Sequence, residues 1–295
     1  MVNSYLKNDP DKISEQYCIR KPIKDYKNAE EVITFIKNIT KYDPEYNEVI
    51  LNICEKSSPK VCLFLLDYIY QNKLFQFLEV KDNQNRLPIH LICQYQNPEC
   101  VMRILDIYEK LKLDFEVKDN NSFMPIHFIC CYQNEKCVMR ILEIYEHYGF
   151  NFEVKNNIDC MPIHFICTYQ NEKCVMRILE IYDHYEFNFE AKTIDDEMPI
   201  YLICKNQNEK CVIRILDIYE KLKLDFEVKT TDCITPIHCI CENQNEKCVM
   251  RILDIYEELK LNLKITDKYG CTLVDLIFKH QNEKCQQRIL HLMEN

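Results

Sequence analysis

Hydrophobic and polar positions along most of the chain repeat in blocks of constant length. Within a block, a short apolar segment that begins at a proline is followed by a polar stretch and then by a longer amphipathic segment. In the second block the longer segment has Val138, Ile141, Leu142 and Tyr145 at i, i+3, i+4 and i+7, which places them on one helical face. Each block therefore predicts a helix, a turn and a second helix whose apolar stripe is buried against neighbours.

Helix-start signals set the limits of these two helices. The first helix of the second block is predicted from Pro125 to about Tyr132, because proline is tolerated at the first helical position, where no donor is needed. Asn134 is predicted to cap the second helix, since Asn97 in the preceding block is followed by Pro98 directly after the cap position.

Alternating apolar and charged residues follow the second helix, as in Asp-Phe-Glu-Val-Lys-Asp at 114–119, and predict an extended finger. A turn then precedes the next block, and in the last copy Gly270 can take the left-handed conformation there. In the other copies this place is held by Asn85, Ser122, Asp159, Asp196 and Cys233. Because Ser122 and Cys233 would be strained by roughly 1 to 2 kcal/mol in that conformation, we expect irregular fingers.

The blocks have a fixed period of 37 residues. Their first helices begin at Pro88, Pro125, Pro162, Pro199, Pro236 and Leu273. Each copy continues with Gln-Asn-Glu-Lys-Cys or, at 96–100, with Gln-Asn-Pro-Glu-Cys. A divergent earlier copy precedes these six. We therefore predict an array of seven units over 45–295, of which the first is divergent and the last truncated, preceded by an N-terminal cap segment, 1–44, with a short helix from Ala29 to about Ile39.

The blocks resemble the ankyrin repeat family, whose module reads Asp-x-x-Gly-x-Thr-Pro-Leu-His, helix, short loop, helix, and Gly-Ala-Asp-Val-Asn. The resemblance covers about 46–295, with its best matches at 267–273 and 235–238. It implies an all-α solenoid of stacked helix-turn-helix repeats with extended fingers. Tetratricopeptide repeats are also helix pairs, but they lack a proline-opened first helix followed by a finger.

The chain departs from the ankyrin pattern in three ways. Leu or Met replaces the motif threonine in four copies, Ile and Cys replace its two small alanines, and the unit has 37 rather than about 33 residues. Four residues are close to one helical turn, so lengthening the second helix by roughly 6 Å keeps the same face buried. We expect second helices about one turn longer than usual, with Gly149 ending one of them.

Composition and net charge argue against several classes of function. The formal net charge of −10 opposes the binding of nucleic-acid phosphates, and no apolar run approaches the roughly 18 residues of a membrane span. The first residues lack the pattern of a secretory signal, so we expect a cytoplasmic or nuclear protein. Two glycines are too few for phosphate-binding loops, and no hydrolase or metalloprotease motif occurs. The sequence predicts no catalytic residue, no cofactor, and neither nucleic acid nor membrane as partner.

Recurring histidines and cysteines are the candidates for chemistry. His90, His127, His164 and His238 each precede a cysteine by three residues, but a pair repeated at one repeat position is not a single special environment. The ankyrin resemblance implies that this histidine bonds the turn and neighbouring backbone. Most of the nineteen cysteines fall at two repeat positions, seven residues apart across the interhelix loop. Without a Cys-x-x-Cys zinc knuckle we interpret them as small buried apolar residues. A metal or redox-buffering protein stays the alternative.

Charged residues also recur on the second helix. Arginines lie three residues before an acid in five copies, at Arg103, Arg140, Arg177, Arg214 and Arg251. This spacing predicts i,i+3 pairs within each helix, each contributing only a few tenths of a kcal/mol on a solvated face.

Positions that differ between the copies are the candidates for binding, because solenoids present variable side chains on a shared framework. Three successive tyrosines on the first helices suggest an aromatic half-groove. The candidate partner-binding residues are Gln94, Tyr95, Ser122, Phe123, Tyr132, Asp159, Thr168, Tyr169, Asp196, Lys205, Asn206 and Glu242. We therefore predict a non-enzymatic adaptor that binds a protein or peptide on its concave face, although relaxed drift between duplicated copies would produce the same variation.

Overall fold

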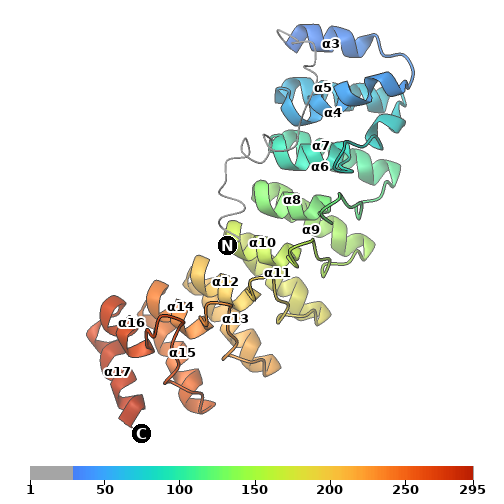
Figure 1. Cartoon of the computed structure of the whole chain (residues 1–295). Helices are drawn as coiled ribbons and strands as arrows, with labels where there is room; N and C mark the ends of the chain where they lie inside the picture. Colours follow the sequence, from blue (N-terminus) through green and yellow to red (C-terminus); the bar gives the residue numbers. More distant parts are fainter. Residues whose placement is uncertain (1–28, 295) are drawn as a thin grey trace. The chain divides into compact units, whose positions relative to one another are not determined.

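The computed structural model describes residues 29–294, which form pairs of α-helices joined by short loops and extended fingers (Figure 1). The chain divides into two compact units, Met1–Ile141 and Leu142–Asn295, and the boundary falls inside helix α9. The predicted all-α repeat architecture is confirmed. The predicted division at residues 44 and 45 stays a prediction.

The first unit stacks its helices in two layers. One layer holds first helices, and the other holds second helices together with the N-terminal helix α3. The elements are α3 (Ala29–Lys37), η1 (Pro44–Tyr46), α4 (Asn47–Lys56), α5 (Pro59–Gln71), η2 (Phe75–Leu78), α6 (Pro88–Tyr95), α7 (Pro98–Leu111), α8 (Pro125–Tyr132) and the first half of α9 (Glu135–Tyr148). In the first layer α4, α6 and α8 are neighbours; in the second, α3, α5 and α7.

The second unit repeats this arrangement. After the second half of α9 come α10 (Pro162–Tyr169), α11 (Glu172–Tyr185), α12 (Pro199–Asn206), α13 (Glu209–Leu222), α14 (Pro236–Asn243), α15 (Glu246–Glu258), α16 (Leu273–His280) and α17 (Glu283–Glu294). Helices α10, α12, α14 and α16 stack in one layer, and α11, α13, α15 and α17 stack in the other.

The helix limits follow the predicted signals. In each of the six copies from Pro88 on, the first helix has 8 residues, and α7, α9, α11 and α13 have 14. The asparagine caps are confirmed; for example, Asn134 Oδ1 accepts from Cys137 N at 3.2 Å. Left-handed residues end the second helices, among them Gly149 at φ +68, as predicted.

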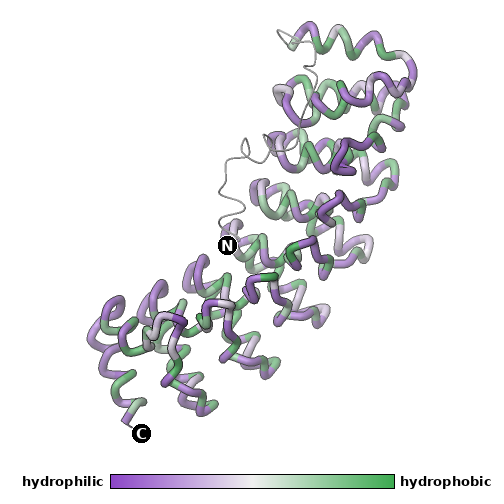
Figure 2. Tube along the Cα trace, viewed as in Figure 1, coloured by the Kyte–Doolittle hydropathy of each residue, from purple (hydrophilic) through white to green (hydrophobic). Residues whose placement is uncertain are grey.

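The core lies between the two layers. Tyr108, Tyr182 and the tyrosines at the same position of α9, α13 and α15 are almost completely buried. The hydroxyls of Tyr108 and Tyr182 donate to Leu78 O and Phe152 O, 30 residues earlier. Figure 2 shows hydrophobic and hydrophilic positions alternating within the helices, as this packing requires. No helix among residues 29–294 is long and apolar enough to cross a membrane.

The expectation of irregular fingers is wrong. Asn85, Ser122, Asp159, Asp196, Cys233 and Gly270 all adopt the left-handed conformation. An Asp, Asn or Thr three residues earlier stabilises each turn: Asp119 Oδ1 accepts from Asn121 N and Phe123 N, and Ser122 N donates to Asp119 O. These bonds offset the strain of a non-glycine residue there. All six fingers therefore share one turn.

The described array has distinctive contacts at each end. Helix α3 packs on α5, and its Val32 and Ile36 are buried. In the last copy Gln286 Nε2 donates to Gln281 O at 3.0 Å and lies 3.5 Å from Phe278 O. In other copies the equivalent carbonyls, such as Cys241 O and Gln244 O, accept from the glutamine of the next copy.

Candidate functional site

A glutamine in each interhelix loop ties its repeat to the preceding one. Gln133 Nε2 donates to Cys93 O at 2.8 Å and to Gln96 O at 3.1 Å. Gln244 Nε2 makes the same two bonds in the second unit, at 2.9 Å each, to Cys204 O and Gln207 O. Because these loop carbonyls would otherwise be buried without donors, this explains why the glutamine recurs in every copy.

The residues after this glutamine also connect repeats. Asn208 Oδ1 caps its own helix by accepting from Cys211 N, while Asn208 Nδ2 donates to Glu172 of the preceding copy at 2.8 Å. Lys210 Nζ bonds the other oxygen of the same carboxylate at 2.6 Å, and these contacts lower the pKa of Glu172. The recurring Gln-Asn-Glu-Lys-Cys segment is thus a stacking device.

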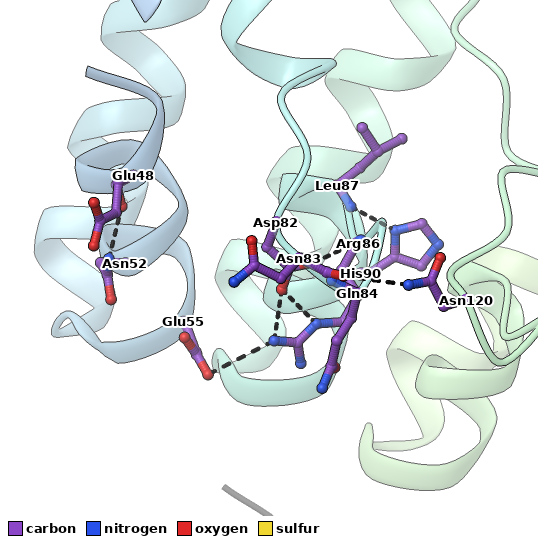
Figure 3. Close-up of polar contacts among 10 residues, drawn as sticks. All are labelled: Glu48, Asn52, Glu55, Asp82, Asn83, Gln84, Arg86, Leu87, His90 and Asn120. Carbon is purple, nitrogen blue, oxygen red and sulfur yellow. Dashed lines mark hydrogen bonds and ion pairs between the residues drawn. The ribbon is translucent and has the colours of Figure 1, made fainter. Parts of the chain in front are cut away.

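The recurring histidines are structural, as the ankyrin resemblance implied. His90 Nδ1 accepts from Leu87 N at 3.0 Å (Figure 3), so Nε2 carries the proton and donates to Val117 O of the next finger at 3.1 Å. His164 bonds Met161 N and Ala191 O in the same way. Burial lowers the pKa of both imidazoles to about 4, which keeps them neutral.

The predicted pairing of arginines with acids of the same helix is mostly wrong. For Arg177 the prediction holds, since Glu180, three residues on, lies 3.5 Å away. The closer bridges run to the preceding second helix: Arg214 reaches Asp183 at 3.0 Å, and Arg288 reaches Asp254 and Glu257 at 2.8 and 2.6 Å. Stacked helices bring these acids nearer than the same helix does.

The cysteines of the described chain are all free thiols, and most are buried. Burial raises the pKa of Cys137 and Cys211 to about 11, and it raises the pKa of Cys167 further. Because the thiolate is the form that reacts and binds metals, these environments disfavour both roles. Within residues 29–294 no group of three or more His, Cys, Asp and Glu side chains is arranged to hold a metal ion.

The first unit presents aromatic side chains on its first helices and fingers. The Phe123 and Phe128 rings lie 5.2 Å apart, and Phe128 stacks on Tyr132 at 6.4 Å. Tyr95 and Tyr132 remain 39% and 46% exposed, which leaves ring surface for a partner. Gln94 Oε1, beside them, is buried and has no hydrogen-bond donor in the described chain. We call Arg86, Gln94, Tyr95, Phe123, Phe128 and Tyr132 the aromatic face.

A buried arginine supports this face. Arg86 is only 6% exposed, with its guanidinium 2.7 Å from Asp82 and 4.0 Å from Glu55 (Figure 3). Burial acts to lower the pKa of Arg86, but Asp82 and the hydrogen-bonded Tyr95 hydroxyl hold it above its ordinary value. Arg86 therefore stays charged beside Tyr95.

The second unit presents charged side chains at equivalent positions. Lys205 Nζ lies 3.1 Å from Tyr201 Oη and 5.1 Å from its ring centre. Glu197 is only 8% exposed, and burial raises its pKa although Lys205 acts against this. Cys239 of the next copy is also buried there, and its pKa is raised to about 12. We call Glu197, Tyr201, Lys205, Cys239 and Glu242 the charged face.

The other predicted site residues lie at the fingertips or on the first helices. Ser122, Asp159 and Asp196 lie at the fingertips, where Lys155 and Lys192 pair with the two aspartates at 3.4 and 3.3 Å. Thr168 and Asn206 bond carbonyls of their own helices, and Tyr169 is half-buried. The predicted residues Lys205 and Glu242, in the unit Leu142–Asn295, belong to the charged face.

Sequence reasoning missed Arg86, Glu197 and Tyr201. Arg86 and Glu197 occupy one register, two residues before the first helix, where the six copies have Arg86, Phe123, Cys160, Glu197, Ile234 and Cys271. Comparing copies at that single position would have found it, because no two neighbouring copies share a residue there. Tyr201 stands at the repeat position that the structural histidines His90, His127, His164 and His238 occupy in other copies.

Comparison with solved structures identifies the architecture. One match is a chain in the complex of the Bd0816 predatory endopeptidase from Bdellovibrio bacteriovorus with immunity protein Bd3460, with a TM-score of 0.50, 15% identity, and coverage of 72% of this chain and 98% of that chain. Another is the ankyrin repeat domain of Bcl-3, a member of the IkappaB family, with a TM-score of 0.50, 12% identity, and coverage of 82% and 97%. No family model matches the chain, and no curated protein matches its sequence.

These matches agree with the helix pairs, fingers and left-handed turns described above. The chain therefore has the ankyrin-repeat fold, with 37-residue units.

Proposed function

We propose that this chain is a non-enzymatic module that binds a protein or peptide through its first helices and fingertips. The observation that carries the proposal is the register before the first helix, where Arg86, Phe123 and Glu197 stand in otherwise similar copies. The loop glutamines Gln133 and Gln244 make the same contacts in both units, so the difference at this register is not needed for those contacts.

The chemistry of both faces supports a protein partner. Half-exposed Tyr95 and Tyr132 are of the residue type enriched at binding hot spots, and Gln94 Oε1 is an acceptor that still needs a donor. The charged face adds groups that give orientation and specificity more than affinity. Bd3460 was solved in complex with an endopeptidase, which is consistent with a protein partner for this fold.

The test is affinity capture from the native source, followed by mass spectrometry and measurement of Kd with the captured partner. Tyr95→Ala with Tyr132→Ala, or Lys205→Ala with Glu242→Ala, should weaken capture by tenfold or more, about 1.4 kcal/mol. Lys136→Ala and Asp217→Ala, which alter exposed positions on second helices, serve as controls.

Equal capture by all of these variants would reject binding at the first-helix faces. Circular dichroism and urea unfolding of each variant separate lost binding from lost structure.

A further inference from the structure

A row of exposed apolar side chains follows the ends of the second helices in the unit Leu142–Asn295. Tyr148, Tyr185 and Leu222 are the last residues of α9, α11 and α13, and Leu259 directly follows α15. Their exposed fractions are 47%, 47%, 38% and 52%. Single exposed apolar residues are ordinary, but a regular series marks an interaction surface. We call these four residues the edge row; it shares no residue with the charged face.

The two tyrosines of the edge row stack on neighbouring rings. Tyr148 stacks on Phe150 with ring centres 5.7 Å apart, and Tyr185 stacks on Phe187 at the same distance. Helices α11, α13 and α15 are packed neighbours, so their ends lie side by side (Figure 1). Packed helices are roughly 8–10 Å apart, so the row is close to evenly spaced. The two stacked tyrosines are already held by neighbouring rings, so a partner would lose little entropy by ordering them.

Opposite charges lie beside the two central residues of the edge row, Tyr185 and Leu222. Each row residue is followed by, in order, Gly149, Glu186, Lys223 and Lys260, which take the left-handed conformation that ends the helix. Glu186 and Lys223 are exposed, and neither side chain has an ion-pair partner within residues 29–294. The two central positions of the row therefore carry opposite, unpaired charges.

We propose that the edge row binds the edge row of a second copy of this chain, in antiparallel orientation about a two-fold axis between Tyr185 and Leu222. Tyr148 then packs on the partner's Leu259, and Tyr185 packs on the partner's Leu222. Glu186 faces the partner's Lys223, and the symmetry operation makes each of these contacts twice.

The spacing of the edge row and the charges beside it both favour a second copy over an unrelated partner. A row spaced by the repeat is matched by a row with the same spacing, and the antiparallel order pairs an aromatic with an aliphatic side chain at every step. A parallel order would place Glu186 against Glu186 and Lys223 against Lys223, which like-charge repulsion opposes. Four half-exposed side chains offer less than the roughly 800 Å² per partner of a standard interface. The dimer should therefore dissociate on dilution.

Sedimentation velocity of the full chain over a wide range of concentration tests the dimer. The wild type should shift from monomer to dimer as concentration rises, and Tyr185→Asp with Leu222→Asp should stay monomeric throughout. Ile194→Asp is the matched control, because Ile194 is 51% exposed on a finger of the same unit, and it should dimerise like the wild type. A monomeric wild type, an unaffected double variant or a monomeric control would each overturn the proposal.

A charge exchange tests the antiparallel order. Glu186→Lys and Lys223→Glu should each weaken the dimer about tenfold, while the two together should restore it, because Lys at 186 would then face Glu at 223 of the other copy. A combined variant no tighter than the single ones would contradict this order. Circular dichroism confirms that each variant is folded.

Discussion

The aromatic face of the first unit and the charged face of the second lie on the same framework of paired helices, but they present different side chains. At one register the first has Phe123, stacked near Phe128 and Tyr132, and the second has the buried carboxyl group of Glu197. Gln133 and Gln244 make the same loop contacts in the two units. The two units thus share this loop contact, while the side chains on their faces differ.

The largest expected effect is a shared response to acid. The pKa of His90 and of His164 is about 4 when folded, against an ordinary value of 6.5. The unfolded chain binds these protons first, so stability is complete above about pH 6.5 and is lost as the pH falls toward 4. A pKa difference of about 2.5 corresponds to about 3 kcal/mol for each histidine.

Urea unfolding over this pH window measures the effect. His90→Asn or His164→Asn keeps an acceptor for the turn but does not titrate, so each variant should have a flatter pH dependence than the wild type. Exposed His280→Asn should leave the curve unchanged. If only one of the two variants had a flatter pH dependence, the repeat framework would not be equivalent in the two units.

Removing the loop glutamine should have a smaller, equal effect in both units. Gln133→Ala and Gln244→Ala each leave two loop carbonyls without their donor and should lower the free energy of unfolding by about 2 kcal/mol. Gln94→Ala, on the aromatic face, should change it by less than about 0.5 kcal/mol. Chemical denaturation monitored by circular dichroism gives these values, and a Gln94 effect as large as the other two would contradict the separation of frame from face.

The smallest expected effect belongs to the bridges between second helices. Arg288→Ala breaks contacts to Asp254 and Glu257 and should lower the free energy of unfolding by about 0.5 kcal/mol, since both acids are about half exposed and solvent screens the bridges. The loss should shrink further in high salt. A loss above about 2 kcal/mol at any salt concentration would show that these bridges stabilise the stack directly.

The sequence predicts the repeat period and the helix limits well because their causes are local. Prolines begin the first helices, Asn134 caps a second helix, and Gly149 ends one, each acting within a few residues. The fingers were mispredicted although their cause is also local. The strain at Ser122 was considered alone, whereas Asp119 three residues earlier supplies the bonds that stabilise it.

The remaining errors concern contacts between repeats. Arg214 bonds Asp183, 31 residues away, because the stacking register places the preceding helix beside it. Helical periodicity describes only neighbours in the same helix, so it could not reveal this partner. The same limit applies to the faces: the sequence identified Tyr132 and Lys205 as variable, but the burial of Arg86 and Glu197 beside them depends on adjacent copies.

Site-specific photo-crosslinking tests most directly whether the faces bind and the frame does not. Benzoylphenylalanine would replace Tyr132 on the aromatic face and Lys205 on the charged face, and, as controls, Lys136 and Asp217 on second helices. Illumination in the native source should crosslink a partner protein from at least one face position and from neither control. Equal crosslinking from Lys136 or Asp217, or none from Tyr132 and Lys205, would contradict the account.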